Sequence, residues 1–498
     1  MSGPERTGVE QIEAVLERIA SHARNPTHLG GLQEWVPALL LLAWCRDNLP
    51  REDGAASPAA PFEGWRLPED WPDLWDTGPD PEDVLSRAFR ALEAANPPLR
   101  GVFSALGLDR PRLNAASPTW RGTLVGAMRM LADMDLAADR LELPDAAGRA
   151  LHAFLLRVAG EWKSGMGSFV TPPALVQLLV QLADPQPGMA VGDPACGSGG
   201  LLIEAARHVA ARQERRLGVD PVDVTLQGQD VHPGAWATAR VLATLHGLPG
   251  MELALGNVLT EPAFTSSLGL PLYHRVVSVP PFSLGNWGAE SARDDPYRRF
   301  EHVPPRNAGD YAFVQHALAT LARGGMAVLL LPSSALFRST EMLIRASLVI
   351  DRNVLDAVIA LPPNLLFGVA IAPAVLVLRA ERPEGRGVLL MDASELVTPA
   401  RPRNLLAPEH VARIVAAYRA FADEEGVARV VSADELEDTS FDLRPGRYVR
   451  TAETFTRRPV AELLADVCRA EAERDAAAAE IDALISDLRG AIGESADG

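Results

Sequence analysis

The sequence predicts an α/β protein built on a doubly wound, largely parallel sheet, with a helical region before the sheet and a helical tail after it. Apolar residues recur at helical spacing through the first part of the chain. Short apolar strands then alternate with helices, which is typical of a parallel sheet. The end of the chain returns to helical spacing. We therefore expect a helical domain at 1–150, a sheet domain at 151–400 and a helical tail at 401–498.

The first region contains three segments with the periodicity of amphipathic helices. They cover 8–23, 83–95 and 123–136. The stretch 49–83 is rich in proline and acidic residues, which break both helices and strands. We expect it to be a surface loop between helices.

The middle region contains six short apolar runs that read as buried strands. They lie at 190–197, 224–230, 274–282, 324–332, 354–362 and 374–380. The intervening segments read as helices at 200–213, 233–247, 311–325 and 339–350. Ligands bind such sheets at the carboxyl ends of the strands, so the loops that follow the strands are the first place to look for function.

The tail has small or apolar residues at a spacing of three and four, interrupted by Arg474. These positions are 460, 463, 467, 470, 477, 481, 484 and 488. The spacing is that of a coiled-coil seam, which would pack on a partner or on the N-terminal helices. An amphipathic terminal helix lying on its own domain is the alternative.

Composition restricts the environment and the partners. The net charge is −18, whereas a protein that grips nucleic acid through its own surface is usually basic. If DNA is the substrate, a partner should therefore hold much of it. The three cysteines, Cys45, Cys196 and Cys468, form neither a disulfide framework nor a CxxC metal site, so we expect a cytoplasmic protein without a bound metal. The most apolar run, 35–44, is about half the length that a bilayer requires, and we expect no membrane segment.

A glycine-rich turn follows the first predicted strand. Gly197, Gly199 and Gly200 would let backbone N–H groups approach a ligand at the start of a helix. The turn lacks the Lys-Ser/Thr pair of a P-loop and departs from the dinucleotide fingerprint. Asp193, at the tip of the strand, can instead bond a cationic ammonium group.

Two further polar residues follow the next strands. Asp230 ends the second strand, where a carboxylate commonly binds the two hydroxyls of a ribose. A helix-capping role just before Pro233 is the alternative. The stretch "LALGNVLTEP" at 253–262 ends a further strand, which comes third in the chain, and its Asn257 can reach an adenine amino group or the target. A ribose together with an amino-acid head group describes S-adenosylmethionine, which we predict as the cofactor.

Several spaced motifs, taken in order, resemble the N6-adenine DNA methyltransferases, in particular the modification subunits of type I restriction–modification systems. They are "GSFVTPPALVQLLV", "DPACGSGGLLIEAA", "GQDVHPGAWATARV", "GNVL", "VPPF", "GDYAFVQHAL", "GGMAVLLLPSSALFR", "VIALPPNLLFG" and "FDLRPGRYV". The resemblance covers about residues 150–450, and the helical first and last regions fit the plan of that subunit. It implies a Rossmann-like class I methyltransferase fold, with S-adenosylmethionine as cofactor and double-stranded DNA as substrate. It also implies a separate DNA-specificity subunit, together with a restriction subunit or a second copy of the chain.

The resemblance also implies roles for individual residues. The cofactor would contact Phe169, Thr171 and Pro172, then Asp193, Pro194, Gly197 and Gly199 at its methionine end, Asp230 at its ribose and Asn257 at its adenine. The catalytic loop would be Val279, Pro280, Pro281 and Phe282. In the family this loop begins with Asn or Asp. The loop's side-chain oxygen and the carbonyl of the first proline then accept the two hydrogens of the adenine amino group, and its aromatic ring stacks on a flipped base.

Val279 cannot accept a hydrogen bond, which leaves three hypotheses. The chain is an active adenine-specific methyltransferase with a rebuilt loop, a degenerate homologue that binds cofactor, DNA or partners, or an enzyme for another nitrogen in a small molecule, RNA or protein. Strand alternation turns the hydroxyl of Ser278 away from the direction of residue 279, so Ser278 is not expected to replace the missing acceptor.

Arginines cluster in two stretches near the predicted site. They are Arg293, Arg298, Arg299 and Arg306 in one loop, and Arg338 and Arg345 further along. These arginines either contact DNA phosphates or form a solvated network of salt bridges with neighbouring acidic residues.

Overall fold

The computed structural model describes residues 8–22, 26–50, 64–68, 81–106, 108, 118–137, 140–161, 170–401, 403–449 and 460–494. The chain forms two compact units, Met1–Arg450 and Thr451–Gly498. The second unit contains one helix, α14 (Val460–Glu494), with Leu464, Val467 and Ile481 more than half exposed. The predicted tail helix is therefore present, and the surface on which it packs stays a prediction.

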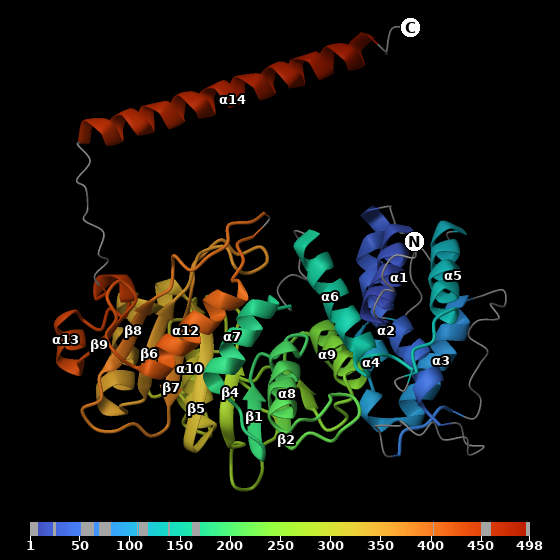
Figure 1. Ribbon diagram of the computed structural model, residues 1–498, viewed down its shortest axis with the longest axis horizontal. Coiled ribbons are helices and arrows are strands. Elements are labelled where there is room, and N and C mark those ends of the chain that lie inside the picture. The colour runs from blue at the N-terminus through green and yellow to red at the C-terminus, as the bar shows by residue number, and fades with distance from the viewer. Residues whose placement is uncertain are drawn as a thin grey trace. The chain divides into compact units, whose positions relative to one another are not determined.

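The first region of the larger unit is helical (Figure 1). Its helices are α1 (Gly8–His22), α2 (Pro26–Asn48), α3 (Pro81–Ala95), α4 (Val102–Ala105), α5 (Pro118–Ala132) and α6 (Ala146–Glu161). The most apolar run of the sequence, 35–44, lies inside α2 and is buried throughout. Within the described residues, no helix is both long enough and apolar enough to cross a bilayer.

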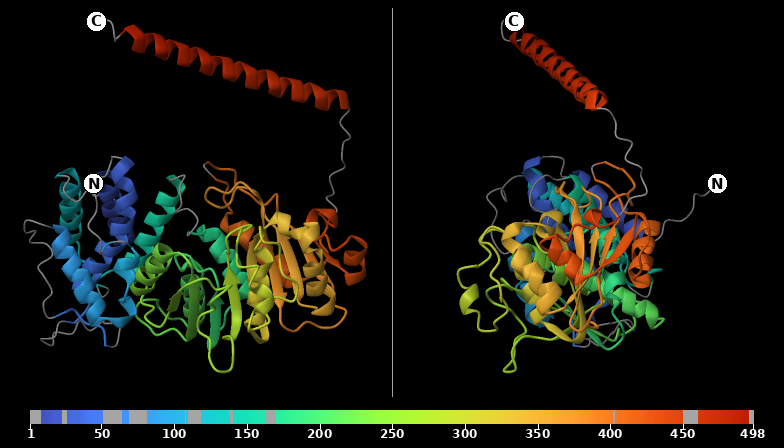
Figure 2. Two further views of the ribbon diagram at one scale, coloured as in Figure 1. Left: turned by 180° about the vertical axis from the view of Figure 1, so that it is seen from behind. Right: turned by 90° about the vertical axis from the view of Figure 1, so that its left-hand side faces the viewer.

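The rest of the larger unit is a nine-stranded mixed sheet with helices packed against it (Figures 1 and 2). Its order is β3-β2-β1-β4-β5-β7-β6-β8-β9. The strands are β1 (Met189–Asp193), β2 (Val224–Asp230), β3 (Glu252–Leu255), β4 (Tyr273–Ser278), β5 (Leu321–Pro332), β6 (Leu355–Ala360), β7 (Pro373–Arg379), β8 (Val388–Asp392) and β9 (Ala428–Val431). Five neighbouring pairs are parallel, while β7 pairs antiparallel with β5 and β6, and β9 with β8. The predicted α/β fold, built on a largely parallel sheet, is confirmed.

Helices cover both faces of this sheet. One core cluster includes side chains from α7 (Pro173–Ala183), α8 (Gly200–Arg212), α9 (Pro233–Leu245) and α12 (Pro408–Ala420). The other includes side chains from α10 (Asp310–Ala319), α11 (Met342–Ala346) and α13 (Ala433–Asp438). Along β4, Val277 belongs to the first cluster and Val276 to the second. This alternation assigns the side chains at the end of β4 to opposite faces.

Two boundaries differ from the sequence prediction. The helix expected at 311–325 ends at Ala319, because the chain enters β5 at Leu321 and the Tyr273 N–H of β4 donates to the Thr320 carbonyl at 2.8 Å. The helix expected at 339–350 is α-helical only at Met342–Ala346, with a 3₁₀ helix at Ser339–Glu341 before it and a π-helix at Ser347–Asp351 after it.

The elements after residue 400 continue the larger unit. Helix α12 packs on the first core cluster, and β9 forms an edge strand paired with β8. The three-part division at residues 150 and 400 stays a prediction.

Candidate active site

The candidate site lies at the carboxyl ends of β1, β2 and β4. Strand β1 pairs with β2 on one side and with β4 on the other, so the strand order reverses here. Asp193 ends β1, Asp230 ends β2 and Val279 directly follows β4. Open α/β sheets bind ligands at such a switch point. The fold thus brings together residues from three separate predicted motifs.

The glycine turn between β1 and α8 is tied to the end of β2. The Gly197 N–H donates to Asp230 Oδ2 at 2.9 Å, and the Cys196 N–H donates to the Gln229 carbonyl at 3.0 Å. Gly199 has a φ of 81°, and a Cβ at this position would lie 3.0 Å from Met251 Cε. Glycine is needed at Gly199 for its backbone conformation as well as for space.

Asp193 has one carboxylate oxygen without a partner. Its Oδ1 accepts hydrogen bonds from Ser278 Oγ at 2.7 Å and from the Ala195 N–H at 3.0 Å. Its Oδ2 is buried and accepts no hydrogen bond in the described part of the chain. Burial raises the pKa of Asp193 to about 7, and the nearby Asp230 adds to the effect. An unpaired buried carboxylate is costly, so Oδ2 fits a cationic group such as an ammonium.

Asp230 accepts a hydrogen bond from the glycine turn, and apolar side chains lie exposed beside it. Its Oδ1 accepts the His232 N–H at 2.8 Å, and burial raises its pKa. The N-cap of α9 is His232 rather than Asp230, because the His232 side chain accepts the Ala235 N–H. Val231 is 66 % exposed and Leu255 is 49 % exposed. A carboxylate next to two solvent-facing apolar side chains suits a ribose attached to a flat ring. Neither Val231 nor Leu255 was predicted from the sequence as a site residue.

The remaining residues that were predicted to bind the cofactor are Asn257, Pro172, Thr171 and Phe169. Asn257 follows β3, and its Oδ1 already accepts the Leu259 N–H at 3.0 Å, so its amide NH₂ is the group left for a ligand. Pro172 is buried and is the N-cap of α7, and Thr171 beside it is half-buried. Phe169 lies outside the described residues. The roles of these residues stay predictions.

The loop after β4 places its side chains on the two faces of the sheet. Val279 and Phe282 are half-buried and pack against the first core cluster, Pro280 is buried and Pro281 is exposed. Ser278 is fully buried, and its hydroxyl donates to Asp193. The Ser278 side chain is directed toward Asp193, on the face of the strand opposite Val279, so its hydroxyl does not take the place of the acceptor that Val279 lacks, in agreement with the strand-alternation argument.

A charge cluster fixes the downstream end of this loop. The Ser283 N–H donates to Asp310 Oδ1 at 2.8 Å, and Ser283 has a φ of 49°. Arg338 donates to Asp310 Oδ2 at 2.7 Å and to Glu341 Oε1 at 2.8 Å. Burial raises the pKa of Glu341 to about 7. No role was assigned to Asp310 or Glu341 from the sequence, although Asp310 lies in the "GDYAFVQHAL" motif and Glu341 lies three positions after the "GGMAVLLLPSSALFR" motif.

Comparison with known proteins identifies the family. The sequence profile described as N-6 DNA Methylase matches residues 142–457, more than half of the chain. The chain belongs to this family. S-adenosylmethionine, predicted from the residues, is the methyl donor of these N-6 DNA methylases. The predicted family membership is confirmed.

Curated relatives of this N-6 DNA methylase include subunits of type I restriction enzymes. The MjaIX methylase subunit of Methanocaldococcus jannaschii is 27 % identical over 391 residues, covering 74 % of this chain and 66 % of the relative. The HindI methylase subunit of Haemophilus influenzae is 26 % identical, covering 82 % of this chain and 92 % of the relative. The chain thus spans about two thirds of the length of the archaeal relative.

Solved structures share the fold of the methylase. The type I restriction-modification system methyltransferase subunit from Streptococcus thermophilus superposes with a TM-score of 0.76 at 23 % identity, covering 89 % of this chain and all of that one. At this identity, the similarity speaks for the fold.

Two of the arginines noted in the sequence are buried and two are exposed. Arg299 and Arg345 are buried and donate to backbone carbonyls, and Arg299 also pairs with Asp295 at 2.6 Å. These two serve the structure. Arg293 and Arg298 are exposed, and no ion pair with either is present among the described residues, so they suit phosphate contacts.

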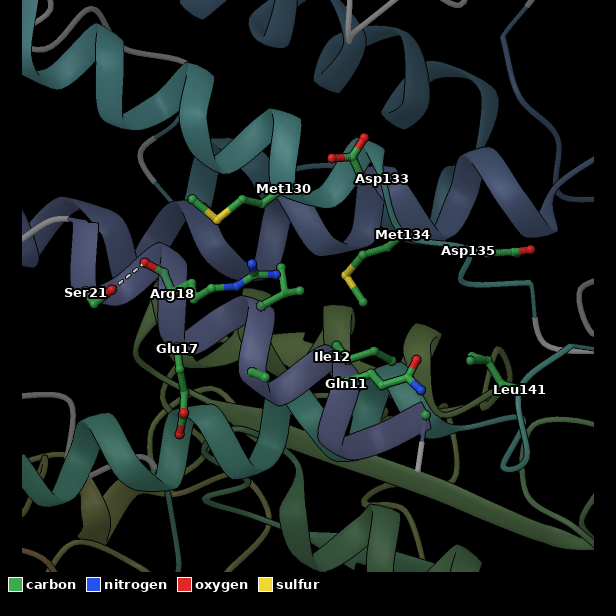
Figure 3. A pocket seen from close by; sticks show the side chains of 13 residues that line it. Gln11, Ile12, Glu17, Arg18, Ser21, Met130, Asp133, Met134, Asp135 and Leu141 are labelled. Carbon is green, nitrogen blue, oxygen red and sulfur yellow. Dashed lines mark hydrogen bonds between the residues drawn. The ribbon is translucent and has the colours of Figure 1, made fainter. Parts of the chain in front are cut away.

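A groove in the helical region lies away from this site. It has a volume of about 900 Å³ and runs between α1 and the end of α5 (Figure 3). Its labelled lining residues are Gln11, Ile12, Glu17, Arg18, Ser21, Met130, Asp133, Met134, Asp135 and Leu141. They come from the helical region and not from the carboxyl edge of the sheet. In the described residues, no group of three or more His, Cys, Asp or Glu side chains could hold a metal.

The raised pKa of Asp193 predicts pH-dependent cofactor binding. The ionised carboxylate attracts the ammonium group, and with a pKa of about 7 the carboxylate is mostly protonated at pH 6. We expect the affinity for S-adenosylmethionine to fall about tenfold from pH 7.5 to pH 6, measured by calorimetry. Asp193→Asn should bind weakly at both pH values. An unchanged pH profile in this variant would assign the effect to another group.

Proposed function

We propose that the chain is the modification subunit of a type I restriction–modification assembly. It transfers a methyl group from S-adenosylmethionine to N6 of adenine in double-stranded DNA, together with a separate DNA-specificity subunit. The observation that carries the proposal is the placement of Asp193, Asp230 and the Val279–Phe282 loop at one switch point of the sheet.

The cofactor end of this site contains an unpaired carboxylate oxygen and exposed apolar side chains. The unpaired Oδ2 of Asp193 supports binding of the ammonium of the methionine group. Asp230, with Val231 and Leu255 exposed beside it, supports binding of the ribose and adenine. S-adenosylmethionine supplies an electrophilic methyl group on a sulfonium. The Pro280 carbonyl next to this end can accept a hydrogen from the target amino group and stabilise the positive charge that develops on its nitrogen.

The DNA end of the site depends on partners. A net charge of −18 is poorly suited to binding DNA alone, and a specificity subunit supplies the missing contacts. Arg293 and Arg298 add positive charge in the segment that follows the Val279–Phe282 loop, the base loop, in the sequence. Helix α14, with its exposed apolar positions, is proposed to join the partner. A restriction subunit or a second copy of the chain completes the assembly, in the cytoplasm, which the three unpaired cysteines favour.

A second candidate function is a degenerate methyltransferase with a regulatory or defence role. Val279 lacks an acceptor, and the neighbouring Ser278 hydroxyl is already used by Asp193. Losing one preorganised contact of this kind costs about two to three orders of magnitude in rate. This candidate keeps the cofactor site and differs from the first in turnover.

Cofactor binding is the first test of either candidate. We expect calorimetry to show stoichiometric binding of S-adenosylmethionine to the full chain. Asp230→Ala should weaken binding about tenfold to thirtyfold, because it removes the ribose acceptor and releases the Gly197 N–H. Leu268→Ser, in a fully exposed loop position, is the matched control and should bind like the wild type. Absence of binding, both alone and with the specificity subunit, would refute both candidates.

A further inference from the structure

The base loop presents one hydrogen-bond acceptor and one apolar side chain. No hydrogen bond in the described part of the chain uses the Pro280 carbonyl, so that oxygen is available to a ligand. Val279 lies on the face of the first core cluster together with Phe282. The loop therefore combines a free carbonyl, two methyl groups and an aromatic ring within four residues.

The two serine hydroxyls that flank the loop in sequence are both engaged in hydrogen bonds. Ser278 lies on the opposite face, and its Oγ is bonded to Asp193. The Ser283 Oγ accepts a hydrogen bond from Arg338 Nη2 at 3.3 Å. Both hydroxyls that flank the loop in sequence are thus engaged with residues of the fold.

The loop is also fixed at both ends. Upstream, β4 is hydrogen-bonded between β1 and β5. Downstream, the Ser283 N–H is held by Asp310 at 2.8 Å, and the Gly309 N–H donates to the Leu284 carbonyl at 2.9 Å. Asp310 is in turn held by Arg338. A backbone held in this way does not rearrange at low cost to bring in another carbonyl.

We propose that this loop preferentially holds N6-methyladenine, so that the chain reads an adenine that is already methylated. The inference rests on the proposed binding of a flipped adenine at this loop. Valine reaches one heavy atom less far than asparagine, which leaves a methyl-sized space where the side-chain oxygen would stand. N6-methyladenine has one N–H for the Pro280 carbonyl and one methyl group for Val279. Unmodified adenine has a second N–H, which would be buried without an acceptor.

The expected preference follows from the unpaired N–H. Leaving one buried donor without a partner corresponds to between about 5-fold and 100-fold in affinity. Contact of the additional methyl group with Val279 acts in the same direction. Dimethylation removes the last N–H, so N6,N6-dimethyladenine should bind less well than the monomethylated base.

The experiment compares short duplexes in which the target position, opposite an abasic site, carries adenine, N6-methyladenine, N6,N6-dimethyladenine or thymine. Full-length protein, together with the specificity subunit and S-adenosylhomocysteine, is titrated, and binding is followed by fluorescence anisotropy. We expect the wild type to bind the N6-methyladenine duplex at least 5-fold more tightly than the adenine duplex. Val279→Asn should bind the adenine duplex more tightly than the N6-methyladenine duplex. Val279→Thr is nearly isosteric with the wild type and therefore preserves packing if Asn disturbs it. This variant should at least abolish the preference for N6-methyladenine.

The outcomes separate this inference from the proposed function. Equal binding of adenine and N6-methyladenine, both tighter than thymine, overturns the inference and leaves the adenine-binding loop intact. Binding that ignores the base, or no binding to DNA, overturns both. A methyl preference that persists in Val279→Thr and Val279→Asn would also overturn the inference, because the preference would not arise at Val279.

Discussion

Replacing Val279 with Asn is expected to raise the initial rate of adenine methylation by about two to three orders of magnitude. The new side-chain oxygen would stand beside the Pro280 carbonyl, so that two acceptors receive the two hydrogens of the amino group. The surrounding loop is already in place, since Asp310 holds Ser283 and Phe282 remains for stacking. Transfer of a tritiated methyl group to unmethylated DNA, with the specificity subunit present, measures the change.

Three results of this measurement have different meanings. A slow wild type and a fast Val279→Asn variant support a methyltransferase that lacks one acceptor. Activity in the variant alone supports the degenerate homologue. A wild type as fast as the variant would show that the loop obtains its second acceptor in another way, and would refute the argument from Val279. Val279→Leu, which adds no acceptor, is the control and should not accelerate transfer.

The sequence predicts the site well where the chemistry is local. The glycine turn, Asp193 and Asp230 lie at strand ends, as the alternation of strands and helices indicates, because parallel strands place their carboxyl ends at one edge. The same alternation predicts that Ser278 and Val279 face opposite ways, and the Ser278–Asp193 hydrogen bond agrees.

Contacts between distant segments could not be predicted in this way. Asp310 and Ser283 are 27 positions apart, and Asp193 and Ser278 are 85 apart. No spacing rule connects such pairs, because they meet only when neighbouring strands and helices pack. Strands β8 and β9 were also not predicted, and β9 is only four residues long with a burial pattern that does not alternate strictly. The helix expected at 311–325 extended too far because sheet pairing overrode local helical preference.

A second large effect concerns stability and involves a buried charge cluster on β6. Asp356 is fully buried, and its carboxylate pairs with Arg379 at 2.9 Å, Arg382 at 3.2 Å and Arg386 at 3.5 Å. The Tyr418 hydroxyl of α12 donates to Asp356 Oδ2 at 2.9 Å. Arg382 is itself only 1 % exposed, so its charge depends on this carboxylate. One aspartate thus forms ion pairs with arginines from the end of β7 and from the turn that leads into β8.

We expect Asp356→Ala to lower the free energy of unfolding by about 3–5 kcal/mol, because removing one partner leaves a buried guanidinium without its countercharge. Urea denaturation followed by circular dichroism gives the change in midpoint at constant slope. Glu381→Ala removes the partner of Arg323 in an exposed pair at 2.7 Å, and as the matched control it should cost less than about 1 kcal/mol. Asp356→Asn, which keeps an acceptor and loses the charge, should lie between the two. If Asp356→Ala cost no more than Glu381→Ala, Arg382 would have to be neutralised by other groups, and the cluster would contribute packing rather than charge.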